Sequence, residues 1–275
     1  MESLTLTKRQ LQEWYNQRYS APLGDNAESV YDAGRQASAS DEVNESGLFG
    51  LLDKYGRTKQ ILDVGCGDGR YLIPFAEKGF SVTGIDSSES AIKRFKEIAK
   101  RKGLEDNVHT LNADIRDFPL PQNKYDLILC RLVLQQLTRQ DIPKVIKNLK
   151  KGTTFGGFNS ISLPGFTQRK LPNNSLLRWE GETNYSDEEV VNMLTDNYCD
   201  FIPFDTHTTK PSDWKVRVYQ DISIDAGITR QDISHSYSFL HIPGLPEFTK
   251  EFKTYEINEH IFHLLAQRLR PLAGG

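Results

Sequence analysis

Between residues 60 and 161, short apolar runs alternate with stretches of helical spacing. Continuous apolar runs of this length are typical of strands that are buried on both faces of a sheet. The predicted strands are Gln60–Val64, Phe80–Ile85, Val108–Asn112, Tyr125–Cys130 and Phe155–Ile161, of which Tyr125–Cys130 is the most apolar. Strands that alternate with helices predict a parallel sheet whose crossover helices cover both faces. We therefore expect an α/β fold with a sheet of about seven strands.

Cap signals mark the starts of three helices. Ser87 or Ser88 can cap the helix that follows the second strand. Thr138 is expected to cap the helix after the fourth strand. Further along the chain, Ser186 and Glu189 have the spacing of a capping box.

The first 55 residues predict elements that precede this core. Apolar positions recur at helical spacing over residues 7–19, which predicts an extra N-terminal helix with an aromatic face. Residues 20–46 contain few large apolar groups and are expected to form a mobile connection that orders on ligand binding. A second helix is expected over residues 47–55. The expected division is an N-terminal helix and lid segment, a core, and a C-terminal part that completes or caps the same domain, with the ranges 1–46, 47–206 and 207–275.

The C-terminal third has a weaker pattern. Residues 163–181 predict an ordered loop or a short hairpin. Strand character returns over residues 201–206, 216–224 and 233–242. Residues 255–270 have an apolar spacing that predicts a terminal helix.

Composition excludes several classes of function. The net charge is −3, and the Lys and Arg residues are dispersed along the chain, so no nucleic-acid partner is expected. No apolar stretch is long enough to span a bilayer, and the first ten residues are too polar for a signal peptide. The three cysteines, at positions 66, 130 and 199, form neither a disulfide framework nor a zinc pattern. We expect a cytoplasmic protein with reduced thiols and without a membrane partner.

The most informative segment is ILDVGCGDGR, residues 61–70, in which a strand leads into a glycine-rich turn. Glycines at this turn allow the backbone to approach a ligand, and the following helix would present unpaired N–H groups to it. Such a turn is typical of a nucleotide-type cofactor site. The dinucleotide fingerprint requires a wider spacing between its second and third glycines, and here only Asp68 separates Gly67 from Gly69. This spacing disfavours a nicotinamide dehydrogenase.

Acidic residues follow the next two predicted strands. Asp86 lies about twenty residues after the glycine loop, where a carboxylate can accept hydrogen bonds from ribose hydroxyls. A role as a cap of the following helix is the alternative, and both can hold. Asp114 follows the third strand, with Ile115 beside it. It is either a ligand-binding acid or an ordinary turn acid like Asp117.

Together these residues resemble the class I S-adenosylmethionine (SAM) methyltransferases. The resemblance covers residues 49–161, and DLILCRLVLQQLTRQDIPKVIKNLKKGTTFGGFNSI is similar to the tellurite-resistance-type small-molecule methyltransferases. It implies a Rossmann-like sheet and SAM as the cofactor. Asp114 would accept hydrogen bonds from the adenine amino group, and the backbone of Cys130 and Arg131 would meet the cofactor amino group. The cofactor-binding residues implied are Asp63, Gly65, Cys66, Gly67, Gly69, Asp86, Ser87, Asp114, Ile115, Cys130 and Arg131.

Two features of the segment after the fourth strand limit the classes of molecule that are expected to accept the methyl group. Gln135 and Gln136 stand where many relatives that act on small molecules carry a histidine. The Asn/Asp-Pro-Pro-Tyr signature of amine methylation in nucleic acids and proteins is absent. We therefore expect methyl transfer to a small-molecule acceptor by direct in-line displacement, mainly through positioning. The alternatives are a protein side chain or terminus as the acceptor, and a SAM-binding regulatory protein without turnover.

Candidates for catalysis and acceptor binding lie outside the cofactor loop. His235, His241 and Tyr15 are candidates for an acceptor base. The aromatic residues of the N-terminal helix can form a lid or simply pack on the core, and the candidates for substrate binding are Trp14, Tyr15, Tyr19, Gln135 and Trp179. His260 and His263 are expected to share a helix face, but no carboxylate or cysteine spacing completes a metal site, so no metal is expected. The sequence does not predict an oligomeric state.

Overall fold

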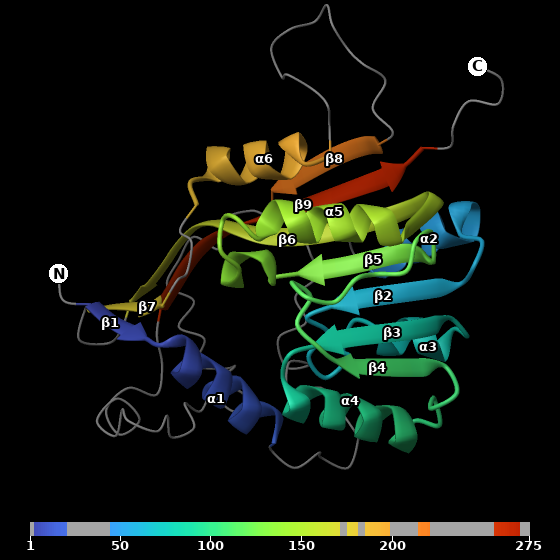
Figure 1. Ribbon diagram of the computed structural model, residues 1–275, viewed down its shortest axis with the longest axis horizontal. Coiled ribbons are helices and arrows are strands. Elements are labelled where there is room, and N and C mark those ends of the chain that lie inside the picture. The colour runs from blue at the N-terminus through green and yellow to red at the C-terminus, as the bar shows by residue number, and fades with distance from the viewer. Residues whose placement is uncertain are drawn as a thin grey trace, which may run out of the picture.

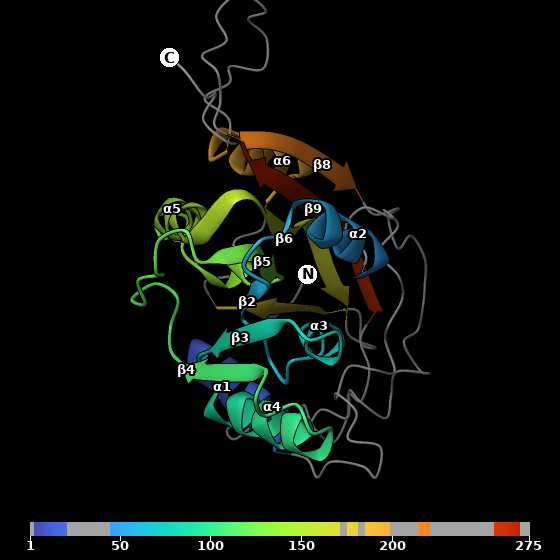
Figure 2. The same cartoon turned by 90° about the vertical axis from the view of Figure 1, so that its right-hand side faces the viewer.

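A computed structural model describes residues 3–20, 45–170, 175–180, 185–198, 214–220 and 256–269. These residues form a nine-stranded mixed sheet in which β1, β7, β6, β5, β2, β3 and β4 follow one another, and β9 joins β6 to β8. Helices cover both of its faces (Figures 1 and 2). The α/β class, with crossover helices on both sides of a parallel centre, is confirmed, and the sheet is larger than the expected seven strands.

Four of the five predicted strands form one side of the parallel centre, and the fifth belongs to β6, which pairs parallel with β5. The four strands are β2 (Gln60–Val64), β3 (Ser81–Asp86), β4 (Val108–Asn112) and β5 (Tyr125–Arg131). β2 lies between β3 and β5, with Asp63 opposite both Gly84 and Leu129. Nearly all of β2 and β5 is buried, because helices cover both faces of these strands.

Two helix layers enclose the sheet. On one face lie α2 (Glu45–Tyr55), α3 (Ile73–Glu77) and α4 (Glu89–Arg101), whose buried side chains share one apolar cluster. The opposite face is covered by α5 (Ile142–Gly152) and α6 (Asp187–Asp196), which belong to a second cluster. Figure 2 shows the two layers on either side of the strands. None of the described helices is long and apolar enough to cross a bilayer.

The cap predictions have mixed outcomes. Ser88, rather than Ser87, caps α4 by accepting a hydrogen bond from the Ala91 N–H. The capping box of α6 is confirmed. The prediction for Thr138 is wrong, because the chain first makes a turn and α5 begins only after Asp141.

The largest correction concerns the end of the chain. Residues 255–270 were expected to form a helix, but Glu256–Arg268 is the strand β9. It pairs antiparallel with β6 (Thr153–Lys170) on one side and with β8 (Trp214–Gln220) on the other. Consequently, His260 and His263 do not lie on a helix. A strand with neighbours on both edges and burial on both faces lacks the alternation that would have revealed it.

Strand β6 is also longer than predicted, and it carries the expected hairpin. After passing β5 it continues to Lys170 and pairs antiparallel with β7 (Leu176–Trp179). Strand β1 (Ser3–Leu6) runs parallel to β7 and leads into α1 (Lys8–Tyr19), the predicted N-terminal helix.

Several predictions fall outside the described residues. These are the strands at 201–206 and 233–242 and nearly all of the connection at 20–46. The predicted strand at 216–224 overlaps β8 over its described part. The division at residues 46 and 206 remains a prediction.

A buried carboxylate ties the amino ends of the strands together. Oδ2 of Asp126 on β5 accepts hydrogen bonds from the backbone N–H groups of Arg57, Thr58 and Lys59, at 2.7, 2.6 and 2.9 Å. Its Oδ1 accepts from the Thr154 hydroxyl at 2.9 Å. This carboxylate fixes the turn that leads into β2, so it sets the start of the strand that carries the glycine loop.

Candidate functional site

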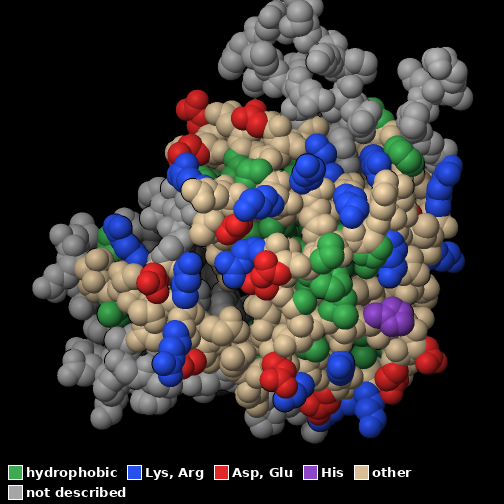
Figure 3. Space-filling model, viewed as in Figure 1, with side chains coloured by type: hydrophobic (Ala, Val, Ile, Leu, Met, Phe, Trp, Pro, Cys, Tyr) green, Lys and Arg blue, Asp and Glu red, His purple; other side chains and the backbone are tan. Residues whose placement is uncertain are grey.

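The carboxyl ends of β2, β3, β4 and β5 meet along one edge of the sheet. In Figure 1 all four arrows point toward the side occupied by α1 and the β1–β7 pair. The surface is hollowed between that side and the body of the sheet, with Lys and Arg side chains at the margin (Figure 3). Ligands of parallel α/β sheets bind at this edge. The predicted cofactor residues lie at the carboxyl ends of these strands or directly after them, so the fold brings them to one edge of the sheet.

The glycine loop after β2 leaves no room for a side chain at its centre. Gly67 has a φ of +55°, a backbone conformation that other residues rarely adopt. A Cβ on Gly67 would lie 2.5 Å from the hydroxyl oxygen of Tyr19 and 3.2 Å from its Cζ. Tyr19 is the last residue of α1. The helix predicted to form a lid therefore ends directly over the loop.

Asp86 at the end of β3 holds the same loop from the other side. Its Oδ2 accepts a hydrogen bond from the Gly67 N–H at 2.9 Å, and its Oδ1 accepts one from the Ser88 N–H at 2.8 Å. Burial raises the pKa of Asp86, and the two backbone hydrogen bonds oppose that shift. The carboxylate thus supports the start of α4 and also lies beside the loop. Its hydrogen bonds to a ribose remain a prediction.

Asp63 near the end of β2 is a buried acid with spare hydrogen-bonding capacity. It is 1% exposed, and its Oδ2 has no hydrogen-bond partner among the described residues. Burial raises the pKa of Asp63 to about 8, and the positive charge of Arg131 opposes the shift. A positively charged ligand would stabilise the ionised form of a carboxyl group of this kind.

A buried ion pair that was not predicted from the sequence lies behind the loop. Oδ2 of Asp68 lies 3.5 Å from Nε of Arg94, and the two side chains are 1% and 5% exposed. The signal was available, because Arg94 falls between Ala91 and Ile98 on the inner stripe of α4. This pair joins the glycine loop to α4.

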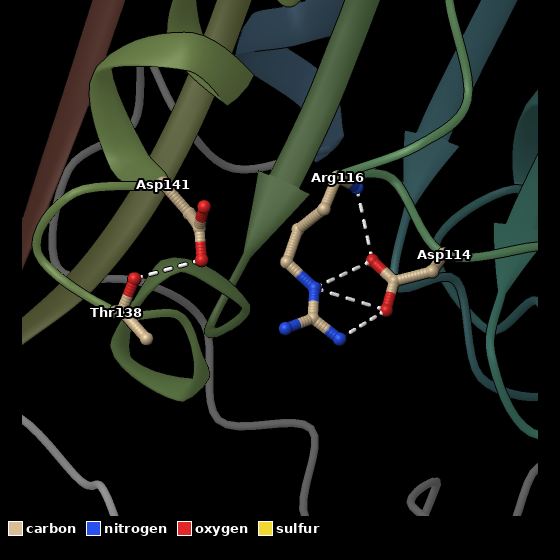
Figure 4. Close-up of polar contacts among 4 residues, drawn as sticks. All are labelled: Asp114, Arg116, Thr138 and Asp141. Atoms are coloured by element: carbon tan, nitrogen blue, oxygen red, sulfur yellow. Dashed lines mark hydrogen bonds and ion pairs between the residues drawn. The ribbon is translucent and has the colours of Figure 1, made fainter.

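The acid after β4 is already engaged by a neighbouring arginine. Arg116 donates to both carboxylate oxygens of Asp114, with Nη2 2.5 Å from Oδ2 and Nε 3.0 Å from each oxygen (Figure 4). The guanidinium lowers the pKa of Asp114, which is therefore ionised at neutral pH. Ile115 beside it is buried in the apolar core, and its contact with the cofactor remains a prediction. In the same view, the Thr138 hydroxyl donates to Asp141.

At the end of β5, two guanidinium groups stack on one aromatic ring. The Cζ atoms of Arg70 and Arg131 lie 4.4 and 4.6 Å from the centre of the Tyr71 ring. Arg131 was predicted from the resemblance, but Tyr71 was not. Burial raises the pKa of the thiols of Cys66 and Cys130, so both stay protonated and act as small packing residues.

The segment after β5 is strained and polar. Leu132 has a φ of +57°, which is rare for a branched side chain. The short helix η2 (Leu134–Gln136) follows, and Oε1 of Gln135 is buried without a hydrogen-bond partner among the described residues. Such an acceptor atom is suited to a donor on a bound molecule. Acceptor binding by Gln135 remains a prediction.

The other predicted site residues are only partly located. Trp14 and Tyr15 lie on α1, and Trp179 ends β7, but their side chains are outside the described part. His235 and His241 lie outside the described residues. Within the described ranges, no group of three or more His, Cys, Asp or Glu residues could hold a metal ion.

Comparison with known proteins also indicates that the core is a methyltransferase domain. Residues 61–157 match the family model of the methyltransferase domain. Over 102 residues the chain is 35% identical to the probable S-adenosyl-L-methionine-dependent methyltransferase TehB of Haemophilus influenzae, a match that covers 37% of this chain and 35% of that protein. It is 32% identical over 149 residues to the ubiquinone biosynthesis O-methyltransferase of Rickettsia canadensis, covering 50% of this chain and 61% of that protein.

A solved structure extends the likeness to the whole fold. The crystal structure of TehB from Haemophilus influenzae superposes with a TM-score of 0.52 and 18% identity, covering 89% of this chain and 67% of that one. At the sequence level, the chain spans only about a third of the length of the TehB protein that it matches. The matched segment contains the glycine loop, Asp86, Asp114 and the first strands of the parallel sheet. Residues 61–157 therefore match the methyltransferase-domain family, and this core is similar to SAM-dependent methyltransferases.

Proposed function

We propose that this protein transfers the methyl group of SAM to a small-molecule acceptor. One observation carries the proposal: the Gly67 N–H donates to Asp86, which joins the glycine loop after β2 to the acid that ends β3. This contact places a glycine-rich loop beside a carboxylate at the ligand-binding edge of a parallel sheet. The spacing of the glycines favours SAM over a dinucleotide.

The residues present fit SAM by their chemistry. The backbone of the glycine loop would lie along the methionine part, because glycine allows the backbone to approach a ligand closely. The carboxylate of Asp86 would accept hydrogen bonds from ribose hydroxyls, and Asp114 would accept them from the adenine amino group. The unpartnered Oδ2 of Asp63 suits a positively charged group near the loop. The backbone of Cys130 and Arg131 would face the cofactor amino group.

The protein's part in such a reaction is positioning. SAM when bound supplies a methyl group that is already activated by the sulfonium charge. The chain would therefore hold the acceptor in line and keep water away, which can supply most of the acceleration. The hollow between the sheet edge and the α1–β1–β7 side is the place where this positioning would occur.

The choice of a small acceptor is supported by the named relatives. The Rickettsia enzyme is named for ubiquinone biosynthesis, and the phosphoethanolamine N-methyltransferase of Zea mays is 28% identical over 178 residues. These names concern small molecules. The net charge of −3 offers no attraction to nucleic acid, so the proposal includes a cytoplasmic enzyme without a nucleic-acid or membrane partner.

Calorimetric titration of the purified protein with SAM and, separately, with NAD tests the cofactor. We expect SAM to bind and NAD not to bind. Asp86→Ala should weaken SAM binding by about 10- to 100-fold, because a charged acceptor is lost. Asp106→Ala, at an exposed acid far from the loop, is the matched control. Binding of NAD instead of SAM would contradict the proposal.

The acceptor class is tested with methyl-labelled SAM and a cell extract that is separated into small molecules and proteins. Label in the small-molecule fraction supports the proposal. Label in the protein fraction alone would establish the alternative, a protein methyltransferase. Tight SAM binding without any label transfer would instead indicate a regulatory binder.

A further inference from the structure

The last turn of α1 makes three contacts with the cofactor side of the sheet. Asn16, Tyr19 and Ser20 have the spacing that places residues on one face of a helix. Oδ1 of Asn16 accepts a hydrogen bond from the Ser88 hydroxyl at 2.7 Å. The Ser20 hydroxyl donates to the hydroxyl of Ser90 at 3.3 Å, and the Tyr19 hydroxyl lies over the glycine loop. This face therefore docks α1 on the glycine loop and on the start of α4.

The first turn of α1 is held at a different place in the fold. The Lys8 N–H donates to Oε2 of Glu180 at 2.8 Å, and Glu180 directly follows β7. The helix has 12 residues, which corresponds to a length of about 18 Å. In Figure 1 it runs from the β1–β7 pair to α4, on the side toward which β2 to β5 point. α1 thus connects two parts of the fold across the carboxyl ends of the parallel strands.

Ser88 links this helix to the acid at the end of β3. Its side chain is 2% exposed, and its hydroxyl donates to Asn16 while it accepts from the Ala91 N–H at 3.2 Å. These two hydrogen bonds fix the position of the hydroxyl. The backbone N–H of the same serine donates to Oδ1 of Asp86 at 2.8 Å. Hydrogen bonds therefore connect the side chain of Asn16, through one buried residue, to the Asp86 carboxylate.

The Asp86 carboxylate has hydrogen-bonding capacity left for a ligand. Its Oδ1 accepts from Ser88, and its Oδ2 accepts from the Gly67 N–H at 2.9 Å. Since a carboxylate oxygen can accept two hydrogen bonds, each oxygen keeps one acceptor position among the described residues. The backbone carbonyl of Asp86 is held separately, by the Ala113 N–H at 3.0 Å and the Asn112 amide at 2.9 Å. Only the side chain thus depends on the loop and on Ser88.

We propose that Asn16 is a positioning residue of the cofactor site, which holds Ser88 so that Asp86 is oriented toward the ribose hydroxyls. The docked helix α1 is thereby coupled to cofactor binding. The inference rests on the proposed function, because it requires Asp86 to bind a ribose. It assigns a role in binding to a residue outside the segment 61–157 that matches the methyltransferase domain.

A coupling of this kind is reciprocal. If the docked helix improves cofactor affinity by some factor, the bound cofactor must stabilise the docked helix by the same factor. One hydrogen bond between neutral groups connects α1 to Ser88, so the expected factor is about 3- to 10-fold. Both directions can be measured, one by titration with ligand and the other by hydrogen exchange of the helix.

The first test is calorimetric titration of the full chain with two ligands. They are S-adenosylhomocysteine, which SAM becomes when it loses its methyl group, and the 2′,3′-dideoxy analogue of that compound. We expect Asn16→Ala to weaken binding of S-adenosylhomocysteine by about 3- to 10-fold. Binding of the analogue should change by less than about twofold, because the analogue has no ribose hydroxyl for Asp86 to accept. Equal losses for the two ligands, or an unchanged affinity for S-adenosylhomocysteine, would overturn the inference.

Two control variants separate positioning from the docking of the helix. Ser20→Ala removes the hydrogen bond to Ser90 and leaves the Asn16 side chain in place. It should change the affinity for S-adenosylhomocysteine by less than about twofold. Arg9→Ala, at an exposed position of α1, should leave the affinity unchanged. If Ser20→Ala costs as much affinity as Asn16→Ala, docking alone explains the loss, and the positioning role is overturned.

The second test measures hydrogen exchange of the α1 backbone with and without S-adenosylhomocysteine. In the wild type, saturating ligand should slow exchange of the last turn of α1 by about 3- to 10-fold. The slowing should be lost in Asn16→Ala at saturation. Exchange of α1 that does not respond to the ligand in the wild type would overturn the inference.

The outcomes separate this inference from the proposed function. If the wild type binds neither SAM nor S-adenosylhomocysteine, the proposed function fails, and the inference fails with it. If Asp86→Ala loses affinity while Asn16→Ala binds like the wild type, the proposed function stands and only the inference is overturned.

Discussion

The hydroxyl of Tyr19 lies over Gly67, at 2.5 Å from the position that a Cβ on that glycine would occupy. The two residues belong to the end of the N-terminal helix and to the centre of the glycine loop. The contact shows how a segment outside the methyltransferase core reaches the cofactor side of the sheet. Both the backbone conformation and the lack of space exclude a side chain at position 67.

Gly67→Val should abolish SAM binding, with a loss of more than about 100-fold in affinity. The branched group would collide with Tyr19 and occupy the space of the methionine part. Gly79→Ala is the matched control, because Gly79 has a φ of +80° and nothing within 4 Å of its Cβ position. The control should cost about 1–2 kcal/mol of unfolding free energy and leave SAM affinity unchanged. Ordinary SAM binding by a folded Gly67→Val variant would show that the loop is not the cofactor cradle.

SAM binding near neutral pH should release a proton from Asp63. Its pKa of about 8 means that the free protein holds it protonated at pH 7. A positively charged ligand favours the carboxylate and lowers that pKa, so the proton leaves. Calorimetry in buffers of different ionisation enthalpy should reveal the release. The release should disappear in Asp63→Asn.

The raised pKa of Asp63 also determines how the stability of the folded protein changes with pH. The ordinary pKa of Asp63 is about 4, and its raised pKa in the folded state is about 8. Between these pH values the folded state holds a proton that the unfolded state has lost, so the stability of the ligand-free protein falls as the pH rises. Asp63→Asn should flatten this dependence in urea unfolding measured across that range. An unchanged slope would contradict the raised pKa.

Substitutions of Asp114 and of its partner Arg116 should weaken SAM binding to different extents. Asp114→Ala removes the acceptor proposed for the adenine amino group and should weaken binding by about 10- to 100-fold. Arg116→Ala breaks a partly exposed ion pair, whose contribution is about 1 kcal/mol or less, so SAM affinity should change by less than about fivefold. Calorimetry on both variants checks the contrast. Equal losses would mean that the pair acts as one structural unit.

Deleting residues 1–20 should reduce methyl transfer more than SAM affinity. The deletion removes α1 and the β1–β7 pairing, which lie on the side toward which β2 to β5 point (Figure 1). Closure and exclusion of water would be lost, while the loop and its acids remain. Asn16→Ala is a milder variant, because Oδ1 of Asn16 accepts a hydrogen bond from the Ser88 hydroxyl at 2.7 Å. Normal turnover by a folded deletion variant would show that the helix has only a structural role.

Asp126→Ala should destabilise the whole domain. Three backbone N–H groups and one hydroxyl would lose their acceptor, which should cost about 3 kcal/mol or more of unfolding free energy. Asp126→Asn keeps an oxygen in the same place and should cost less. Urea unfolding followed by circular dichroism compares the two. Equal stability of wild type and Asp126→Ala would show that the turn before β2 does not depend on this carboxylate.

The core could be predicted because its signals are local. β2, β3 and β5 are almost entirely buried, and the glycine loop and the acids at the strand ends stand at fixed intervals within about fifty residues of one another. Such patterns reflect burial and backbone conformation, which each short segment encodes by itself. They determined the fold class, the edge of the sheet that binds ligand, and the expected family.

Only the tertiary structure decided which distant residues meet. Ser162 and His263 are 101 positions apart, and they became neighbours because β9 inserts between β6 and β8. The apolar spacing of β9 also suits a helix, and burial on both faces removed the alternation that would have distinguished the two. Strand pairing between remote segments leaves no local trace, so neither this pair nor the approach of Tyr19 to Gly67 can be derived from the sequence alone.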